Sequence, residues 1–405
     1  MRDDIAIVGI GLKIADCSSF QEYDLKLQKR ENLCQNLEGR RLKDICNYLK
    51  IIHKNVGQMP GEKHYFLKDI DLFDYAAFHI SPKEAAYMDP NQRLMLETVY
   101  HAFADSGMDI KKGSNTAVFI GYRENHDYLE LVKAYDSDML SFALPGNLPA
   151  AIAGRISYTF DWRGNCQLID SGDSSSVLAL QSACGSISSG EADIAVAGGI
   201  DLYILPFEDQ DRGGIYEWKP KGECVAVVVL KSLSHAIRDR DPIFGVIKCC
   251  ISNRGSLHDS LLQKENLLAD CLRMAGDRAG QITLVELSGT ADTREQEVLK
   301  RLLNKSQNLK NEVPVIDVLS DDIANLEVSS GLMGLIKALL SHDSQRNEFY
   351  STDDKEMCLL AHFGKSGGNT GVILEKARVP VRKRKRLSAE KGKPALENRR
   401  CWIDN

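Results

Sequence analysis

The sequence predicts an α/β protein in which helices cover the faces of its sheets. Short apolar runs alternate with helical patterns along the 405-residue chain, and this alternation is typical of layered α/β folds. Two runs, 194–198 and 224–230, are apolar without interruption, as expected of strands buried on both faces. The alternation occurs in both halves of the chain, without a short tandem repeat.

The elements follow in chain order from periodicity and from start and stop signals. Residues 5–11 predict a buried strand that ends in a glycine turn. Residues 88–107 predict a helix with Pro90 in its first turn and Gly107 as its stop. The other predictions are strands at 116–121, 167–170, 194–198, 224–230, 282–286, 313–319 and 372–375, and helices starting near Ser174 and covering 329–340.

The composition is that of a globular protein, with 43% hydrophobic and 27% charged residues. This suffices for one large or two modest cores. The formal net charge of −6 argues neither for nor against a nucleic-acid partner, and we expect none. No run approaches the roughly 20 apolar residues of a membrane helix, and no signal peptide precedes the first strand. We expect a cytoplasmic protein with no membrane partner, and Met1 directly before that strand favours a free-standing one.

The eleven cysteines are scattered without CxxC spacing. We therefore expect reduced, mostly buried thiols and no metal site. Cys166 falls on a predicted strand and is expected to be a core thiol.

The residues after Lys376 differ from the rest in composition. Segments 378–386 and 391–394 are basic and contain prolines, which favours a solvated linker over a site for an acidic partner. The apolar residues 401–403 are expected to dock back on the body.

Several motifs occur in a fixed order along the chain. They are found at residues 5–11, 66–74, 78–86, 88–93, 154–158, 189–193, 197–199 and 363–369. Together they resemble the β-ketoacyl synthase (ketosynthase) domain of modular polyketide synthases over residues 2 to about 376. The end of the chain, 399–403, resembles the linker that follows such domains.

The resemblance implies a thiolase-like fold, with α-β-α-β-α layers built from two pseudo-repeated halves. It implies a ketosynthase-like domain over 1–376, with halves of roughly 1–230 and 231–376, and a basic tail over 377–405. It also implies that two subunits pair across an edge strand, as a homodimer or as a heterodimer with an active ketosynthase.

The family condenses acyl groups with a cysteine nucleophile, two histidines and a lysine. The cysteine takes the acyl group, and the histidines stabilise charge as malonyl loses CO2. The corresponding turns here read Asp-Ser-Gly-Asp-Ser-Ser (170–175), Ser-Gly-Thr-Ala-Asp (288–292) and Asp-Ile-Ala-Asn-Leu-Glu (322–327). The resemblance places Asp173 at the cysteine position, Ser288 and Asn325 at the histidine positions, and Ser320 at the lysine position.

A carboxylate at a helix N-terminus is favourable, so Asp173 is expected to have a structural or capping role rather than a new catalytic one. Loss of one positioned acid–base group costs roughly 10²–10⁴-fold in rate, and two histidines are replaced. Ser174 and Ser288 are hydroxyls with no obvious base. His362 is near a motif and is expected to be a packed or surface residue.

The resemblance also suggests residues that would hold the phosphopantetheine arm of an acyl carrier protein. Thr290 matches the first of two family threonines, while Asp292 replaces the second. Ser174 and Gly367 belong to turns beside the same site. The loop over 205–222 is shorter than is usual in the family, and residues 209–214 predict a flexible surface turn.

These observations favour a catalytically inactive ketosynthase-like protein of polyketide or related fatty-acid-type biosynthesis. Such a protein would serve as a partner subunit for an active ketosynthase or an acyl carrier protein. An enzyme with altered acyl-thioester chemistry (decarboxylation, hydrolysis or acyl transfer) is the alternative. A decaying relic is a third hypothesis, which the intact apolar strands disfavour.

Overall fold

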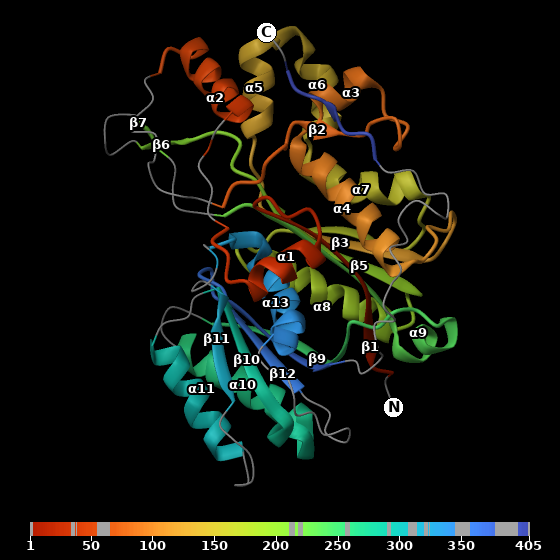
Figure 1. Cartoon of the computed structure of the whole chain (residues 1–405), viewed down its shortest axis with the longest axis vertical. Helices are drawn as coiled ribbons and strands as arrows, with labels where there is room; N and C mark the ends of the chain where they lie inside the picture. The colour runs from red at the N-terminus through yellow and green to blue at the C-terminus, as the bar shows by residue number, and fades with distance from the viewer. Residues whose placement is uncertain are drawn as a thin grey trace.

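In the computed structural model, most elements of the first part of the chain (red to green) lie above those of the second part (teal to blue) (Figure 1). The structure describes residues 3–33, 37, 39–54, 65–209, 215–217, 222–255, 260–289, 293–306, 314–319, 323, 325–344, 357–376 and 396–403.

Each half of the chain contributes five strands, in the same spatial order, to one ten-stranded sheet. The first half runs β4-β3-β5-β8-β1 and the second runs β11-β10-β12-β13-β9. In both rows the first three strands are parallel and the last two pairings are antiparallel. The strands are β1 (Ile5–Ile14), β3 (Thr116–Tyr122), β4 (Cys166–Ile169), β5 (Ile194–Asp201), β8 (Cys224–Ser232), β9 (Gly245–Arg254), β10 (Ile282–Gly289), β11 (Val315–Val318), β12 (Met357–Phe363) and β13 (Gly368–Lys376).

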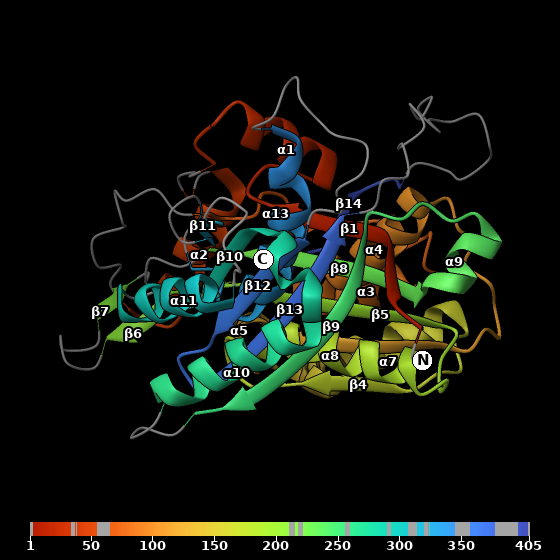
Figure 2. The same cartoon turned by 90° about the horizontal axis from the view of Figure 1, so that it is seen from below.

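Helices pack on the outer side of each half of this sheet, and further helices pack between the two halves. α4 (Pro90–Ser106) and α7 (Pro149–Phe160) pack outside the first half, and α10 (Ser260–Ala275) packs outside the second, alongside α11 (Thr293–Ser306). α8 (Ser175–Ser188) and α13 (Ser330–Ser344) contact each other between the halves. Seen from below, α10 lies in front of the strands it covers (Figure 2). The two repeated halves and the five layers that the resemblance implies are confirmed.

The prediction that the first strand ends in a glycine turn at Gly11 is wrong. β1 continues to Ile14, because its glycines serve close packing rather than a turn. A Cβ on Gly9 would lie 2.6 Å from the carbonyl oxygen of Ala102, and one on Gly11 would lie 2.4 Å from that of Thr98. The glycines therefore let α4 lie directly on the strand.

The predicted signals at both ends of α4 are confirmed. Pro90 occupies its first turn, and Gly107 ends it with a φ of 68°. The remaining described elements are α1 (Phe20–Gln28), α2 (Gly39–Ile51), α3 (Pro82–Tyr87), α5 (Asp127–Tyr135), α6 (Leu140–Asn147), α9 (Leu233–Asp239), three short 3₁₀ helices, and the strands β2 (Leu72–Phe73), β6 (Phe207–Asp209), β7 (Ile215–Glu217) and β14 (Arg399–Arg400).

The end of the chain docks on the first half, as predicted. β14 pairs with β2, and Cys401, Trp402 and Ile403 are buried. Beneath them the fully buried Arg93 donates a hydrogen bond to the carbonyl oxygen of Cys401. The basic residues between 377 and 395 lie outside the described part of the chain.

The prediction for Cys166 is wrong, because its side chain is exposed. β4 is the last strand of the sheet and pairs on one side only, with β3. Of the ten cysteines described, all are unpaired, and seven are buried, in agreement with the general prediction. Among the described residues, no helix is both long and apolar enough to cross a lipid bilayer.

Candidate functional site

The segments that resemble catalytic motifs meet where α8 begins. α8 starts directly after Ser174, and Ser288 and His362 lie near the carboxyl ends of β10 and β12. These two strands pair in parallel with Ser288 opposite His362, and the His362 side chain reaches Ser174 at the start of α8. The glycine-rich turn over residues 364–368 follows β12 and packs on the same point.

His362 is the centre of a buried hydrogen-bond network with Ser174, Ser288 and Gly368, which we call the histidine network. Its Nε2 lies 3.3 Å from Ser174 Oγ, and its Nδ1 lies 3.0 Å from Ser288 Oγ. His362 is therefore packed, as expected. The prediction that the two serines have no base nearby is wrong, because the imidazole comes from a strand adjacent in space and distant in sequence.

The protonation state of the His362 ring follows from its burial and from the hydrogen-bond partners of Ser174. Burial lowers the pKa of His362 from 6.5 to about 4, and the charge of Asp173 opposes this shift, so the ring is neutral at pH 7. Ser174 donates its single proton to the carbonyl oxygen of Gly368, 3.1 Å away. We therefore assign the ring proton to Nε2, which donates to Ser174, while Nδ1 accepts from Ser288. In this tautomer His362 does not activate Ser174.

Asp173, which the resemblance aligns with the family's nucleophile, holds the glycine-rich turn. Its Oδ2 accepts a hydrogen bond from the backbone N–H of Lys365 at 2.8 Å, and Ser366 Oγ lies 3.4 Å from its Oδ1. The expected structural role is therefore present. The expected capping role is not, because Ser174 is the N-cap residue and no side chain caps α8 there.

The glycine-rich turn closes over Ser174. A Cβ on Gly364 would lie 2.1 Å from Ser174 Oγ, and one on Gly368 would lie 2.9 Å from it. Ser174 has no exposed surface, and Asp173 is 9% exposed. Gly367 has a φ of +88° and lies against the carbonyl oxygen of Gly255. In this conformation Ser174 has no surface that a thioester can reach.

Asn325, which the resemblance aligns with the family's second histidine, also stabilises local structure. Its Oδ1 accepts from the backbone N–H of Glu327 at 2.9 Å, and its carbonyl oxygen accepts from Gly222 N–H at 2.9 Å. Glu327 in turn pairs with Arg123, which also bonds Asp201 at 3.0 Å. This amide is held in a fixed turn and, at neutral pH, offers no acid or base.

Three predicted site residues, Ser320, Thr290 and Asp292, lie outside the described residues. Part of the short loop over 205–222 is described. β6 and β7 pair antiparallel in it, and the surface turn predicted over 209–214 lies, apart from Asp209, outside the described residues. The short loop therefore contains regular structure at the backbone level.

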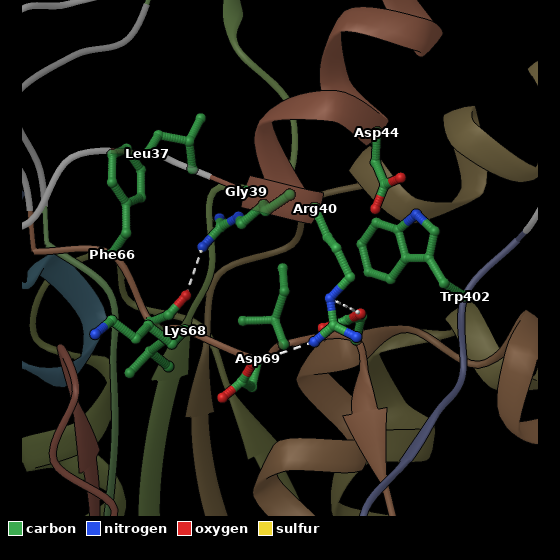
Figure 3. A pocket seen from close by; sticks show the side chains of 12 residues that line it. Leu37, Gly39, Arg40, Asp44, Phe66, Lys68, Asp69 and Trp402 are labelled. Carbon is green, nitrogen blue, oxygen red and sulfur yellow. Dashed lines mark hydrogen bonds and ion pairs between the residues drawn. The ribbon is translucent and has the colours of Figure 1, made fainter.

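A cavity of about 670 Å³ lies away from the histidine network, between α2 and the end of the chain. Figure 3 shows Arg40 pointing toward Asp69 and Trp402 lying below Asp44. The residues that line this cavity include none of the predicted site residues. Within the described residues no group of three or more His, Cys, Asp or Glu side chains is arranged to hold a metal ion.

Sequence reasoning missed the contribution of His362. The available signal was its position directly before the glycine-rich turn, which resembles the turn beside the family's active site. What the linear sequence does not reveal is the parallel pairing of β10 with β12, which sets His362 opposite Ser288.

Comparison with known sequences gives a consistent picture. A family model described as the N-terminal domain of β-ketoacyl synthases matches residues 2–211. A non-reducing polyketide synthase of Stachybotrys bisbyi is 30% identical over 367 residues, which cover 83% of this chain and 16% of the relative. A highly reducing polyketide synthase of Penicillium oxalicum is 32% identical over 314 residues, 70% of this chain and 12% of the relative. The chain thus spans less than a fifth of the length of these curated relatives.

Solved structures share the fold. The ketosynthase from module 6 of the bacillaene synthase of Bacillus subtilis 168 matches with a TM-score of 0.74 and 24% identity, over 93% of this chain and 72% of that one. Ketosynthase twelve from the bacillaene synthase of Bacillus amyloliquefaciens matches with a TM-score of 0.75 and 22% identity, over 93% and 75%. The fold of the chain is thus thiolase-like.

Proposed function

The chain belongs to the β-ketoacyl synthase family, and from this premise we propose that it is a non-condensing, ketosynthase-like subunit that acts by binding a partner. The pathway class is the biosynthesis of polyketides or related fatty-acid-type products. The partner is an active ketosynthase, an acyl carrier protein with its phosphopantetheine arm, or both.

One observation carries this proposal. The positions that correspond to the family's nucleophile and histidines hold Asp173, Ser288 and Asn325, and each of these side chains is used to hold neighbouring structure. Condensation needs a nucleophile that a thioester can reach and groups that stabilise an enolate. A carboxylate bonded to a turn and a hydroxyl bonded to a buried imidazole supply neither.

The edge strand β4 supports a partner role. Cys166 and Gln167 are exposed on it, and its outer side has no strand partner among the described residues. Open edges of this kind pair with strands of other chains. An edge-to-edge dimer, with itself or with an active ketosynthase, extends the sheet there.

The direct test mixes the purified chain with an active ketosynthase and with acetyl- or malonyl-loaded acyl carrier protein from a polyketide pathway, and measures complexes by native mass spectrometry. We expect a dimer with itself or with the ketosynthase, or a complex with the carrier protein. A monomer that binds neither protein overturns the proposal.

A second candidate function, hydrolysis or transfer of acyl groups from thioesters, is favoured by the position of His362 between two hydroxyls. It requires three changes: the glycine-rich turn opens, the ring proton of His362 moves from Nε2 to Nδ1, and the Ser174 hydroxyl turns from the Gly368 carbonyl oxygen to donate to Nε2. The test is release of acetate from acetyl carrier protein. Turnover in the natural chain that disappears in Ser174→Ala and in His362→Gln supports this second function and contradicts the first.

A further inference from the structure

Three sulfur atoms meet on the outer side of the second half, away from the histidine network. Cys249 lies on β9, while Cys271 and Met274 lie three residues apart on α10, which covers β9. The Cys249 Sγ is 3.3 Å from the Met274 Sδ. The Cys271 thiol, on the same helix, lowers the pKa of Cys249 by donating a hydrogen bond to it.

The surroundings fix these sulfurs in place. Cys271 has no exposed surface and Cys249 is 5% exposed. A Cβ on Gly371 would lie 2.3 Å from the Cys271 Sγ, so a glycine on the neighbouring strand β13 makes room for this thiol. Met274 is 60% exposed and gives the sulfur group a route from solvent.

The hydrogen bonds run in one direction through the group. Cys271 donates to Cys249, which lowers the pKa of Cys249, and Cys249 donates to the thioether of Met274. Two hydrogen bonds, from Cys271 to Cys249 and from Cys249 to Met274, thus link the three sulfur atoms. A soft cation that replaces both protons keeps the sulfurs in the same arrangement.

We propose that Cys249, Cys271 and Met274 form a binding site for Cu(I). Thiolates and thioethers select this ion, and Cu(I) accepts three sulfur ligands. Zn(II) in structural sites takes four ligands, and the described residues offer no fourth His, Asp or Glu at this place. Binding forms three Cu–S bonds, breaks two S–H bonds and releases two protons, with no change in oxidation state.

A second thiol pair, on the inner side of β9, serves as an internal control. Cys250, the neighbour of Cys249, faces the other side of β9 and is hydrogen-bonded to Cys184 on α8. No methionine contact is described for that pair. A pair without a third sulfur ligand is expected to hold Cu(I) more weakly.

The test is an anaerobic titration of the full chain with Cu(I), supplied as its acetonitrile complex, in competition with the chelator bathocuproine disulfonate. We expect the natural chain to retain one Cu(I) and to release two protons per ion into a weakly buffered solution. Cys249→Ser loses this ion. Met274→Leu, a change at an exposed position that leaves the core intact, weakens retention by about tenfold.

Cys250→Ser is the matched control and is expected to retain Cu(I) like the natural chain. Unfolding curves of each variant report whether it is folded. The proposal is overturned if the chelator removes all Cu(I) from the natural chain. It is equally overturned if folded Met274→Leu and Cys250→Ser retain Cu(I) identically.

Discussion

At the scale of single residues, His362 has a structural role at the candidate site. Its imidazole stands beside Ser288, the position where the family resemblance places a catalytic histidine, but it comes from β12 rather than β10. There it joins α8, β10 and the glycine-rich turn through hydrogen bonds. Because the ring is fully buried, its protonation is unfavourable, which ties stability to pH.

The histidine network predicts an acid-sensitive fold. The pKa of His362 is about 4 in the folded chain and about 6.5 when exposed, so the unfolded chain takes up the proton first as the pH falls. The stabilisation is complete above pH 6.5 and is lost between pH 6.5 and 4, by about 3 kcal/mol. We expect His362→Gln, which cannot titrate, to flatten this loss in urea unfolding curves.

His126→Gln is the control, because His126 is exposed. Asp173 is the charged group that faces His362, and it is present in both the natural chain and His362→Gln. An equal loss of unfolding free energy between pH 6.5 and 4 in the natural chain and in His362→Gln would show that the network does not control acid stability.

How far the sequence predicts the site is also decided residue by residue. The alignment of Asp173, Ser288 and Asn325 with the catalytic positions of the family rests on the flanks of the motifs and stays a prediction. The partners of these residues were not predictable. The bond from Asp173 to Lys365 joins residues 192 positions apart, and such pairs depend on tertiary structure that local patterns do not encode.

At the scale of elements, β1 and α4 show how glycines set a close helix–strand contact. Gly11→Ala is expected to lower the free energy of unfolding by about 1–3 kcal/mol, because its Cβ would overlap the Thr98 carbonyl oxygen at 2.4 Å. Gly154 lies inside α7 with no atom within 4 Å of its Cβ position. Gly154→Ala is therefore expected to raise this free energy by up to about 1 kcal/mol.

Chemical denaturation of both variants measures these opposite changes in the free energy of unfolding. If Gly11→Ala is as stable as the natural chain, the tight contact between β1 and α4 is not present in solution.

The sequence predicted elements best where a pattern and a boundary signal agree. α4 has a proline start and a glycine stop, and both were found. β12 was not predicted, although all of its residues are buried. A short apolar run fits either a strand or a buried helix segment until its neighbours are known, and one neighbour of β12 is β10, about 70 residues earlier in the chain.

At the scale of the whole molecule, the two halves repeat one sheet order but differ at their edges. β4 ends the first half and β11 ends the second. Local patterns predicted the α/β layers. The repeated topology was implied by the family resemblance, because the spatial order of strands is not a property of any local pattern.

The two end strands of the sheet, β4 and β11, lead to a prediction of where two subunits pair. Cys166→Lys places a charge on the exposed edge of β4, and two such charges face each other across a symmetric strand pair, so we expect it to convert a dimer to a monomer. Val315→Lys places the same charge on β11, where Val315 is 55% exposed, and is expected to leave the dimer intact. Light scattering coupled to size exclusion measures both masses. Dimers of equal stability in both variants would place the interface elsewhere.

The central claim, a ketosynthase fold that does not condense acyl groups, is tested most directly by intact-protein mass spectrometry. The chain is incubated with acetyl and malonyl acyl carrier proteins, beside an active ketosynthase as the positive control. We expect no acetyl group on the chain and no acetoacetyl group on the carrier protein. An acetylated chain together with an acetoacetyl carrier protein would contradict the account.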